Sequence, residues 1–292
     1  ARVILHGDAY DEASAHAQQL ADRHGYAFVH PFDDLDVIAG QGTVGMEIIN
    51  QHGGDLHAIV VPVGGGGLIA GIAAYVKYLK PDIRIVGVEA EGSACLAAAM
   101  AAGRRVRLPA RSLDLFADGA SVAQAGKETF RIARRCVDEV ITVSTDELCG
   151  AIKDIFDDTR SIAEPAGALG VAGVKKYLEA NAVRDAELVA VVSGANVNFD
   201  RLRHISERAE LGEKREAIMA VTIPERPGSF RKFCRVIGKR NITEFNYRYA
   251  DADRAQVYVG VQIGAGDSRQ QLVAALDSAG YPVTDMTDNE VA

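Results

Sequence analysis

Hydrophobic and polar positions along the first 205 residues alternate between two spacings. Short apolar runs rich in β-branched residues are each followed by a segment with helical periodicity, which predicts a parallel sheet covered by helices on both faces. We expect strands at 3–5, 26–29, 57–63, 83–88, 140–143 and 187–192, and helices at 11–24, 43–51, 68–79, 93–102, 127–135, 146–159 and 164–178. Ligands of such sheets bind beyond the carboxyl ends of the strands.

The pattern changes after a charged segment around residues 205–216. Beyond it, strands are expected at 217–223, 242–250, 256–263 and 281–286, with helices at 229–239 and 268–279. This β-α-β-β-α-β order is typical of a ferredoxin-like fold. We therefore expect an α/β core at 1–207, a linker at 208–215 and a ferredoxin-like α+β domain at 216–292.

Length, net charge and cysteine spacing limit the classes of protein to which this chain can belong. A chain of 292 residues is long enough for two domains. Its net charge of −8 argues against a nucleic-acid surface, and no apolar run approaches the roughly 18 residues of a membrane span. The cysteines are far apart in sequence and are expected to be free thiols in a reducing cytoplasm: Cys95, Cys136, Cys149 and Cys234. The chain begins inside a regular element, so we expect a piece of a longer polypeptide.

Gly64, Gly65, Gly66 and Gly67 stand between an apolar strand and a helix. Consecutive residues without Cβ atoms leave backbone N–H groups accessible next to the positive end of a helix, a means of binding a phosphate without a lysine. A flexible turn is the simplest alternative.

Dinucleotide binding is a second alternative, because Gly65, Gly67 and Ala70 satisfy G-x-G-x-x-A and Glu89 ends the next strand, where an acid would bind ribose. The loop lies deep within a series of βα units, and the polar turn 193–196 lies at the same edge of the sheet. These two features favour a different phosphate ligand.

Several motifs follow one another in the order found in biosynthetic threonine ammonia-lyases: 62–68, 88–96, 163–168, 193–198, 206–213 and 222–230. Over essentially its whole length the chain resembles this family of fold-type-II pyridoxal-phosphate enzymes, which carry a C-terminal ACT-like domain. The resemblance implies conversion of L-threonine to 2-oxobutanoate and ammonia by β-elimination, in isoleucine biosynthesis. It also implies pyridoxal 5'-phosphate as cofactor and a cytoplasmic homotetramer.

The resemblance assigns the cofactor phosphate to the N–H groups of the four glycines and of Leu68, and the pyridine nitrogen to Ser193. A hydroxyl there does not enforce a protonated ring, which favours expulsion of a β-leaving group. From the residues alone, Ser193 is equally consistent with a helix N-cap. Glu164 is a weaker candidate, because an acid near a helix N-terminus ordinarily stabilises that end.

Two departures from the family bear on activity. The Schiff-base lysine of the family lies in a Ser-Phe-Lys-type motif upstream of any residue present here, so no lysine is nominated. We therefore expect the chain alone to lack lyase activity. Some relatives bind a divalent cation through an acid at the position of Glu89 and a second acid, where this chain has Cys95, a poor ligand for Mg²⁺ or Ca²⁺. No metal is expected.

The turn Pro227, Gly228, Ser229 and Phe230 is the candidate effector site of the second domain. Pro227 is expected to start a helix whose first N–H groups could hold a carboxylate, although a plain strand-to-helix turn remains an alternative. The resemblance implies inhibition by isoleucine, opposed by valine. Many long relatives carry a second such module after the first, and this chain stops at Ala292, so we expect the effector response to be lost or weakened here.

Two other functions fit the same residues. One is another fold-type-II lyase or a racemase acting on L-serine. The other is a non-catalytic protein that binds amino acids.

Overall fold

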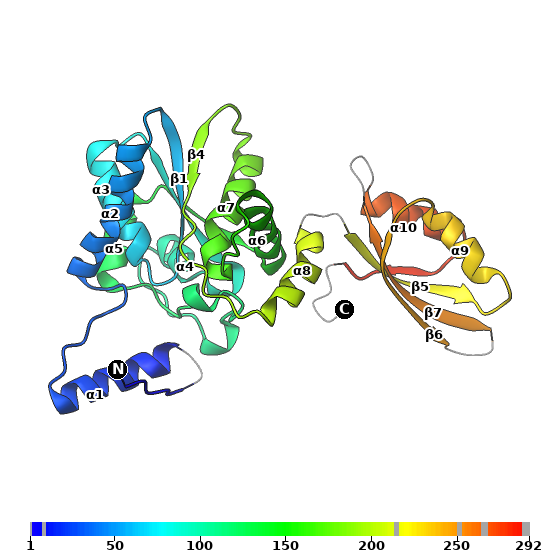
Figure 1. The fold of residues 1–292 in the computed structure, drawn as a ribbon, viewed down its shortest axis with the longest axis horizontal. Coiled ribbons are helices and arrows are strands. Elements are labelled where there is room, and N and C mark those ends of the chain that lie inside the picture. The colour runs from blue at the N-terminus through cyan, green and yellow to red at the C-terminus, as the bar shows by residue number, and fades with distance from the viewer. Residues whose placement is uncertain (1, 8–9, 213–215, 250–252, 264–267, 288–292) are drawn as a thin grey trace. The chain divides into compact units, whose positions relative to one another are not determined.

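The computed structural model describes residues 2–7, 10–212, 216–249, 253–263 and 268–287. The chain divides into two compact units, Ala1–Leu202 and Arg203–Ala292 (Figure 1). Each unit has a four-stranded sheet of its own.

The first unit is built on a four-stranded parallel sheet of order β3-β2-β1-β4. Its strands are β1 (Leu56–Pro62), β2 (Arg84–Ala90), β3 (Glu139–Val143) and β4 (Glu187–Ala190). In the register, Val60 of β1 lies opposite Val86 of β2 and Ala190 of β4. The central strands β1 and β2 are buried along nearly their whole length, which explains their continuous apolar sequences.

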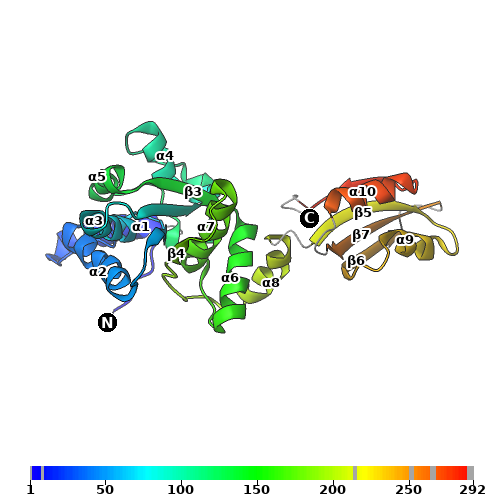
Figure 2. The ribbon, with the colours of Figure 1, turned by 90° about the horizontal axis from the view of Figure 1, so that it is seen from above.

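Helices cover both faces of this sheet, as the sequence predicts (Figures 1 and 2). One face carries α3 (Gly67–Leu79), with α2 (Leu35–Gln51), α4 (Cys95–Ala102) and α5 (Lys127–Cys136) around it; the other carries α7 (Pro165–Asn181) and α6 (Thr145–Thr159). A hydrophobic core between the sheet and the first group of helices includes Ile59, Ile69, Leu96 and Phe130.

The N-terminal segment departs from the prediction. Residues 3–5 and 26–29 form no strand, and Val3, Leu5, Tyr26 and Val29 are exposed on either side of α1 (Tyr10–His24). Within the described ranges no strand pairs with these segments, and an apolar run becomes a strand only when another strand satisfies its N–H and C=O groups.

Helix α2 begins earlier than expected, at Leu35 instead of residue 43. The carboxylate of Asp34 caps it by accepting the N–H groups of Asp36 and Val37 at 2.8 and 3.2 Å.

The second unit has the expected ferredoxin-like order. Strand β5 (Glu216–Pro224), α9 (Ser229–Ile237), β6 (Ile242–Tyr249), β7 (Arg254–Gln262), α10 (Arg269–Ser278) and β8 (Val283–Asp285) follow one another. The antiparallel sheet has the order β6-β7-β5-β8, and both helices pack on one face of it over a core that includes Met219, Val221, Phe233 and Leu272. Helix α8 (Arg201–Gly212) covers the first part of the expected linker 208–215, whose residues 213–215 lie outside the described residues.

No helix in the described ranges combines the length and the apolar character needed to cross a membrane.

Candidate functional site

Two polar turns leave the same edge of the parallel sheet. Strand β1 runs into the glycine loop, residues 64–67, and β4 runs into the turn at 193–196. Because β1 and β4 are neighbouring parallel strands, the two turns emerge side by side at their carboxyl ends. This is the position predicted for a ligand site in an open α/β sheet.

The carbonyl groups of the glycine loop are held by partners from several elements. Gly65 O accepts the hydroxyl of Thr129 at 2.8 Å and the N–H of Gly126 at 3.2 Å. Gly66 O accepts the N–H of Ala70 at 3.0 Å, and the Cys95 thiol lies 3.6 Å from Gly64 O.

The amide groups of the loop have no such partners. Within the described ranges, none of the N–H groups of residues 64–68 donates a hydrogen bond. In a trans peptide the N–H points opposite to the preceding C=O, so amides whose carbonyls are held from one side face the other. Helix α3 starts at Gly67 and adds the positive end of its dipole. The arrangement fits an anion such as a phosphate.

The glycine loop is in close contact with an aromatic side chain. The ring of Phe32 packs on it so closely that a Cβ added to Gly65 would lie 2.3 Å from the ring. Gly66, with φ of 93°, adopts the left-handed conformation that glycine tolerates. Glycine is therefore needed at 65 for close packing and at 66 for the turn.

Ser193 is exposed, and the chain after it is not helical until α8. Its hydroxyl makes no hydrogen bond within the described part of the chain. These two observations exclude the helix N-cap alternative and leave the hydroxyl available at the sheet edge.

Glu164 lies beside the turn that contains Ser193. It occupies the N-cap position of α7, yet its side chain makes no capping hydrogen bond. Its backbone N–H donates to Gly194 O at 3.1 Å, and its carboxylate accepts the N–H of Asn196. Burial, and then the carboxylate of Asp118, raise the pKa of Glu164, while the Asn196 N–H opposes the shift. The fold thus brings an acid with a raised pKa to the same edge as the glycine loop.

Glu89 is buried and already bound by the protein. Its two carboxylate oxygens accept the N–H groups of Leu96 and Ala97, each at 2.8 Å, at the start of α4. Burial raises the pKa of Glu89 to about 7, against the opposing effect of these hydrogen bonds. A carboxylate enclosed in this way cannot reach a ribose, which removes a main support of the dinucleotide alternative.

Cys95 lies next to Glu89, and burial together with the Glu89 carboxylate raises the pKa of its thiol. Among the residues that the structure describes, no group of three His, Cys, Asp or Glu side chains is placed to hold a metal ion.

The candidate effector turn lies between β5 and α9. Gly228 is the N-cap of α9, with φ of 87°, so the helix begins at Ser229 and Pro227 precedes it instead of starting it. Phe230 is 44% exposed, and its ring meets that of Phe245 edge to face at 5.0 Å. The turn thus presents a helix N-terminus beside exposed aromatic rings.

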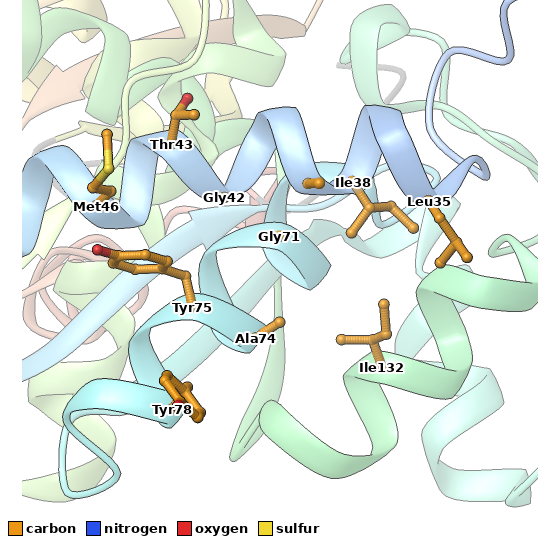
Figure 3. A pocket seen from close by; sticks show the side chains of 11 residues that line it. Leu35, Ile38, Gly42, Thr43, Met46, Gly71, Ala74, Tyr75, Tyr78 and Ile132 are labelled. Atoms are coloured by element: carbon orange, nitrogen blue, oxygen red, sulfur yellow. The ribbon is translucent and has the colours of Figure 1, made fainter.

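A cavity of about 490 Å³ lies elsewhere in the first unit, between α2, α3 and α5 (Figure 3). Its lining is mostly apolar and includes Ile38, Met46, Tyr75 and Tyr78. None of the predicted site residues lines it.

The sequence did not identify three residues that support the glycine loop: Phe32, Asp33 and Thr129. Phe32 and Asp33 fall between the expected strand at 26–29 and the expected helix at 43–51, and Thr129 lies within the expected helix at 127–135. The one available signal was the pair Asp33 and Asp34, two N-cap candidates before a single helix.

Two protein families match the two parts of the chain. Residues 1–194 match the family described as pyridoxal-phosphate dependent enzyme, and residues 207–292 match the family described as the C-terminal regulatory domain of threonine dehydratase. The chain is 53% identical to a biosynthetic L-threonine dehydratase of Burkholderia multivorans, over 99% of this chain and 57% of that protein. It is 51% identical to the corresponding Salmonella typhimurium protein, over 99% and 56%.

Among solved structures, the processed form of threonine deaminase isoform 2 from Solanum lycopersicum is similar at a TM-score of 0.68 and 42% identity, covering 71% of this chain and 60% of that one. The chain spans little more than half the length of the curated relatives it matches.

Proposed function

This chain belongs to the family of pyridoxal-phosphate-dependent enzymes, and from that premise we propose that it is the phosphate-binding and regulatory part of a threonine ammonia-lyase. The proposed reaction converts L-threonine to 2-oxobutanoate and ammonia. One observation carries the proposal: the identity of 53% to a biosynthetic L-threonine dehydratase extends over both units of the chain. A shared sheet alone would not distinguish lyases from racemases.

When bound, pyridoxal phosphate supplies an electron sink for the carbanion left by loss of the α-proton. The amides of Gly64 to Gly67 and of Leu68 would hold its phosphate. The Ser193 hydroxyl would face the ring nitrogen as a neutral partner. Glu164, whose pKa is raised by burial and by Asp118, is suited to hold a proton beside the turn that contains Ser193.

The second unit is proposed to regulate the enzyme. The match to a threonine dehydratase regulatory domain supports binding of an amino-acid effector. We assign isoleucine as inhibitor and valine as its opponent, with Pro227, Gly228, Ser229 and Phe230 at the effector site. The enzyme would act in isoleucine biosynthesis as a cytoplasmic homotetramer.

Joining the chain to a relative's N-terminal segment tests the proposed reaction. The 292-residue chain is fused in frame after the N-terminal segment of the Burkholderia multivorans protein that its own match does not cover. Formation of 2-oxobutanoate from L-threonine and of pyruvate from L-serine is measured with added pyridoxal phosphate, for the fusion and for the chain alone.

We expect the fusion to prefer L-threonine and the chain alone to be inactive. A folded fusion that binds the cofactor and yet produces no 2-oxobutanoate contradicts the proposal. A fusion that forms pyruvate from L-serine in preference to 2-oxobutanoate from L-threonine favours the alternative of a lyase that acts on L-serine.

A further inference from the structure

Glycine residues impose little conformational preference, so the direction of each peptide group in the loop must be set by its neighbours. The central peptide joins Gly65 to Gly66. Its carbonyl receives two hydrogen bonds, from the Thr129 hydroxyl at 2.8 Å and the Gly126 N–H at 3.2 Å. Because C=O and N–H of a trans peptide point in opposite directions, these bonds turn the Gly66 N–H away from α5.

Thr129 is held in place from a distant part of the chain. It is fully buried in the first turn of α5, and the residue before that helix, Gly126, has no side chain to cap it. Asp33 supplies the cap instead. Its carboxylate accepts the N–H groups of Lys127 at 2.7 Å, Glu128 at 2.8 Å and Thr129 at 3.3 Å.

The residue before Asp33 also contacts the glycine loop, through an aromatic ring. Phe32, which precedes Asp33, packs against Gly65. The Nδ1 atom of His30 fixes this turn by accepting the N–H groups of Phe32 and Asp33 at 3.2 and 2.8 Å. The glycine loop is therefore contacted both by the Phe32 ring and by the Thr129 hydroxyl, and Asp33 ties these two groups together.

From these contacts we infer that Thr129 is a positioning residue of the phosphate site: its hydroxyl orients the Gly65–Gly66 peptide so that the Gly66 N–H faces the anion, and Asp33 fixes Thr129 for this role. The inference rests on the proposed binding of a phosphate at the glycine loop. It adds two residues, Thr129 and Asp33, from outside the glycine loop.

Equilibrium dialysis of the 292-residue chain tests this role with three probes: pyridoxal 5'-phosphate, inorganic phosphate and pyridoxal, which lacks the phosphate. Thr129→Val removes the hydroxyl at nearly constant volume, and Thr129→Ser retains it. Thr159→Val is a control at an exposed position, because the Thr159 hydroxyl also donates to a carbonyl, Ile155 O at 2.6 Å, but in α6.

We expect Thr129→Val to weaken binding of pyridoxal phosphate and of inorganic phosphate by about three- to tenfold, the effect of losing one buried hydrogen bond. Binding of pyridoxal should stay unchanged. Thr129→Ser and Thr159→Val should bind all three probes as the parent chain does.

The possible contrary results are distinguishable. A folded Thr129→Val chain that binds pyridoxal phosphate as tightly as the parent overturns the positioning role and leaves the phosphate site standing. Equal losses in Thr129→Val, Thr129→Ser and Thr159→Val also overturn it, since they would reflect general destabilisation. A parent chain that does not discriminate pyridoxal phosphate from pyridoxal overturns the phosphate site and the positioning role together.

If Thr129→Val does not fold, Asp33→Asn takes its place. This variant retains one acceptor oxygen for α5 and loses the other, so it should show the same phosphate-selective loss. An Asp33→Asn chain that binds inorganic phosphate normally overturns the inference.

Discussion

Helices α3 and α9 begin with nearly the same backbone turn and are surrounded very differently. Each follows a left-handed glycine: Gly66 has φ and ψ of 93° and 4°, and Gly228 has 87° and −2°. A Cβ added to Gly66 would lie 3.1 Å from Thr129, whereas one added to Gly228 would meet nothing within 4 Å. Local geometry is therefore shared, and the difference lies in what packs against it.

The backbone N–H groups at the starts of α3 and α9 differ in the same way as their surroundings. At α9 the N–H of Ser229 is already taken by Arg226 O at 3.0 Å, and Phe233 and Ile237 are the helix's buried residues. At α3 most of the helix is buried and the loop carbonyls are fixed by other elements. Donors fixed during folding need not be ordered again when a ligand binds. The glycine loop is thus preorganised for an anion, while the Pro227–Phe230 turn is open.

Among these predictions, the largest loss of stability should come from adding one methyl group to the glycine loop. We expect Gly65→Ala to lower the free energy of unfolding of the first unit by about 3 kcal/mol, because the new Cβ would lie 2.3 Å from the Phe32 ring. Urea unfolding followed by circular dichroism would measure this, and the transition of the second unit should not move.

Removing the aromatic ring provides the control. Gly65→Ala combined with Phe32→Ala should lose less stability than the two single changes predict together, because the clash disappears. Strict additivity would mean that the ring and the loop are not in contact.

Solution pH should change the stability of the first unit through Glu89. Its pKa is about 7 in the folded protein against an ordinary value of 4.5, so the folded state binds the proton more tightly than the unfolded state. Stability from this group is therefore full below pH 4.5 and is lost as pH rises toward 7. Between pH 5 and 8 the loss should be about 2.5 kcal/mol.

Glu89→Gln should abolish most of this pH dependence, since glutamine does not titrate. Unfolding of both proteins at pH 5, 6, 7 and 8 checks the prediction. The same slope in Glu89→Gln would assign the pH dependence to another group.

The smallest loss of stability is expected at the turn that contains Gly228. Gly228→Ala should destabilise the second unit by about 1 kcal/mol, which is the cost of a left-handed conformation for alanine without any clash. Gly228→Asn should cost less, because asparagine tolerates that conformation better. Thermal unfolding of the two variants measures the difference, and a loss at Gly228→Ala as large as that at Gly65→Ala would remove the contrast between the loops.

The sequence predicted those elements of the fold that produce a regular local pattern of hydrophobic and polar residues. Strands β1 and β2 read as continuous apolar runs because both faces are covered, and the β-α-β-β-α-β order of the second unit followed from alternating elements. The segments at 3–5 and 26–29 carry the same apolar signal and form no strand. Strand formation depends on a partner elsewhere in the chain, which periodicity does not report.

For the candidate site, too, the local features could be predicted from the sequence and the long-range contacts could not. The positions of the glycine loop and of the turn at 193–196 followed from the rule that parallel strands end at one edge. The contact of Asp33 with α5 joins residues 94 positions apart, and a remote carboxylate that caps a helix leaves no pattern near that helix. The packing of Phe32 on Gly65 is equally non-local.

The remote cap on α5 has a consequence for how the protein folds during synthesis. Asp33 and the glycines both leave the ribosome before residues 127–136, so the acceptor for the first turn of α5 already exists when that helix emerges. We expect the helix to dock early during synthesis, whereas refolding of the whole chain from denaturant must close this long stretch of chain before the contact forms.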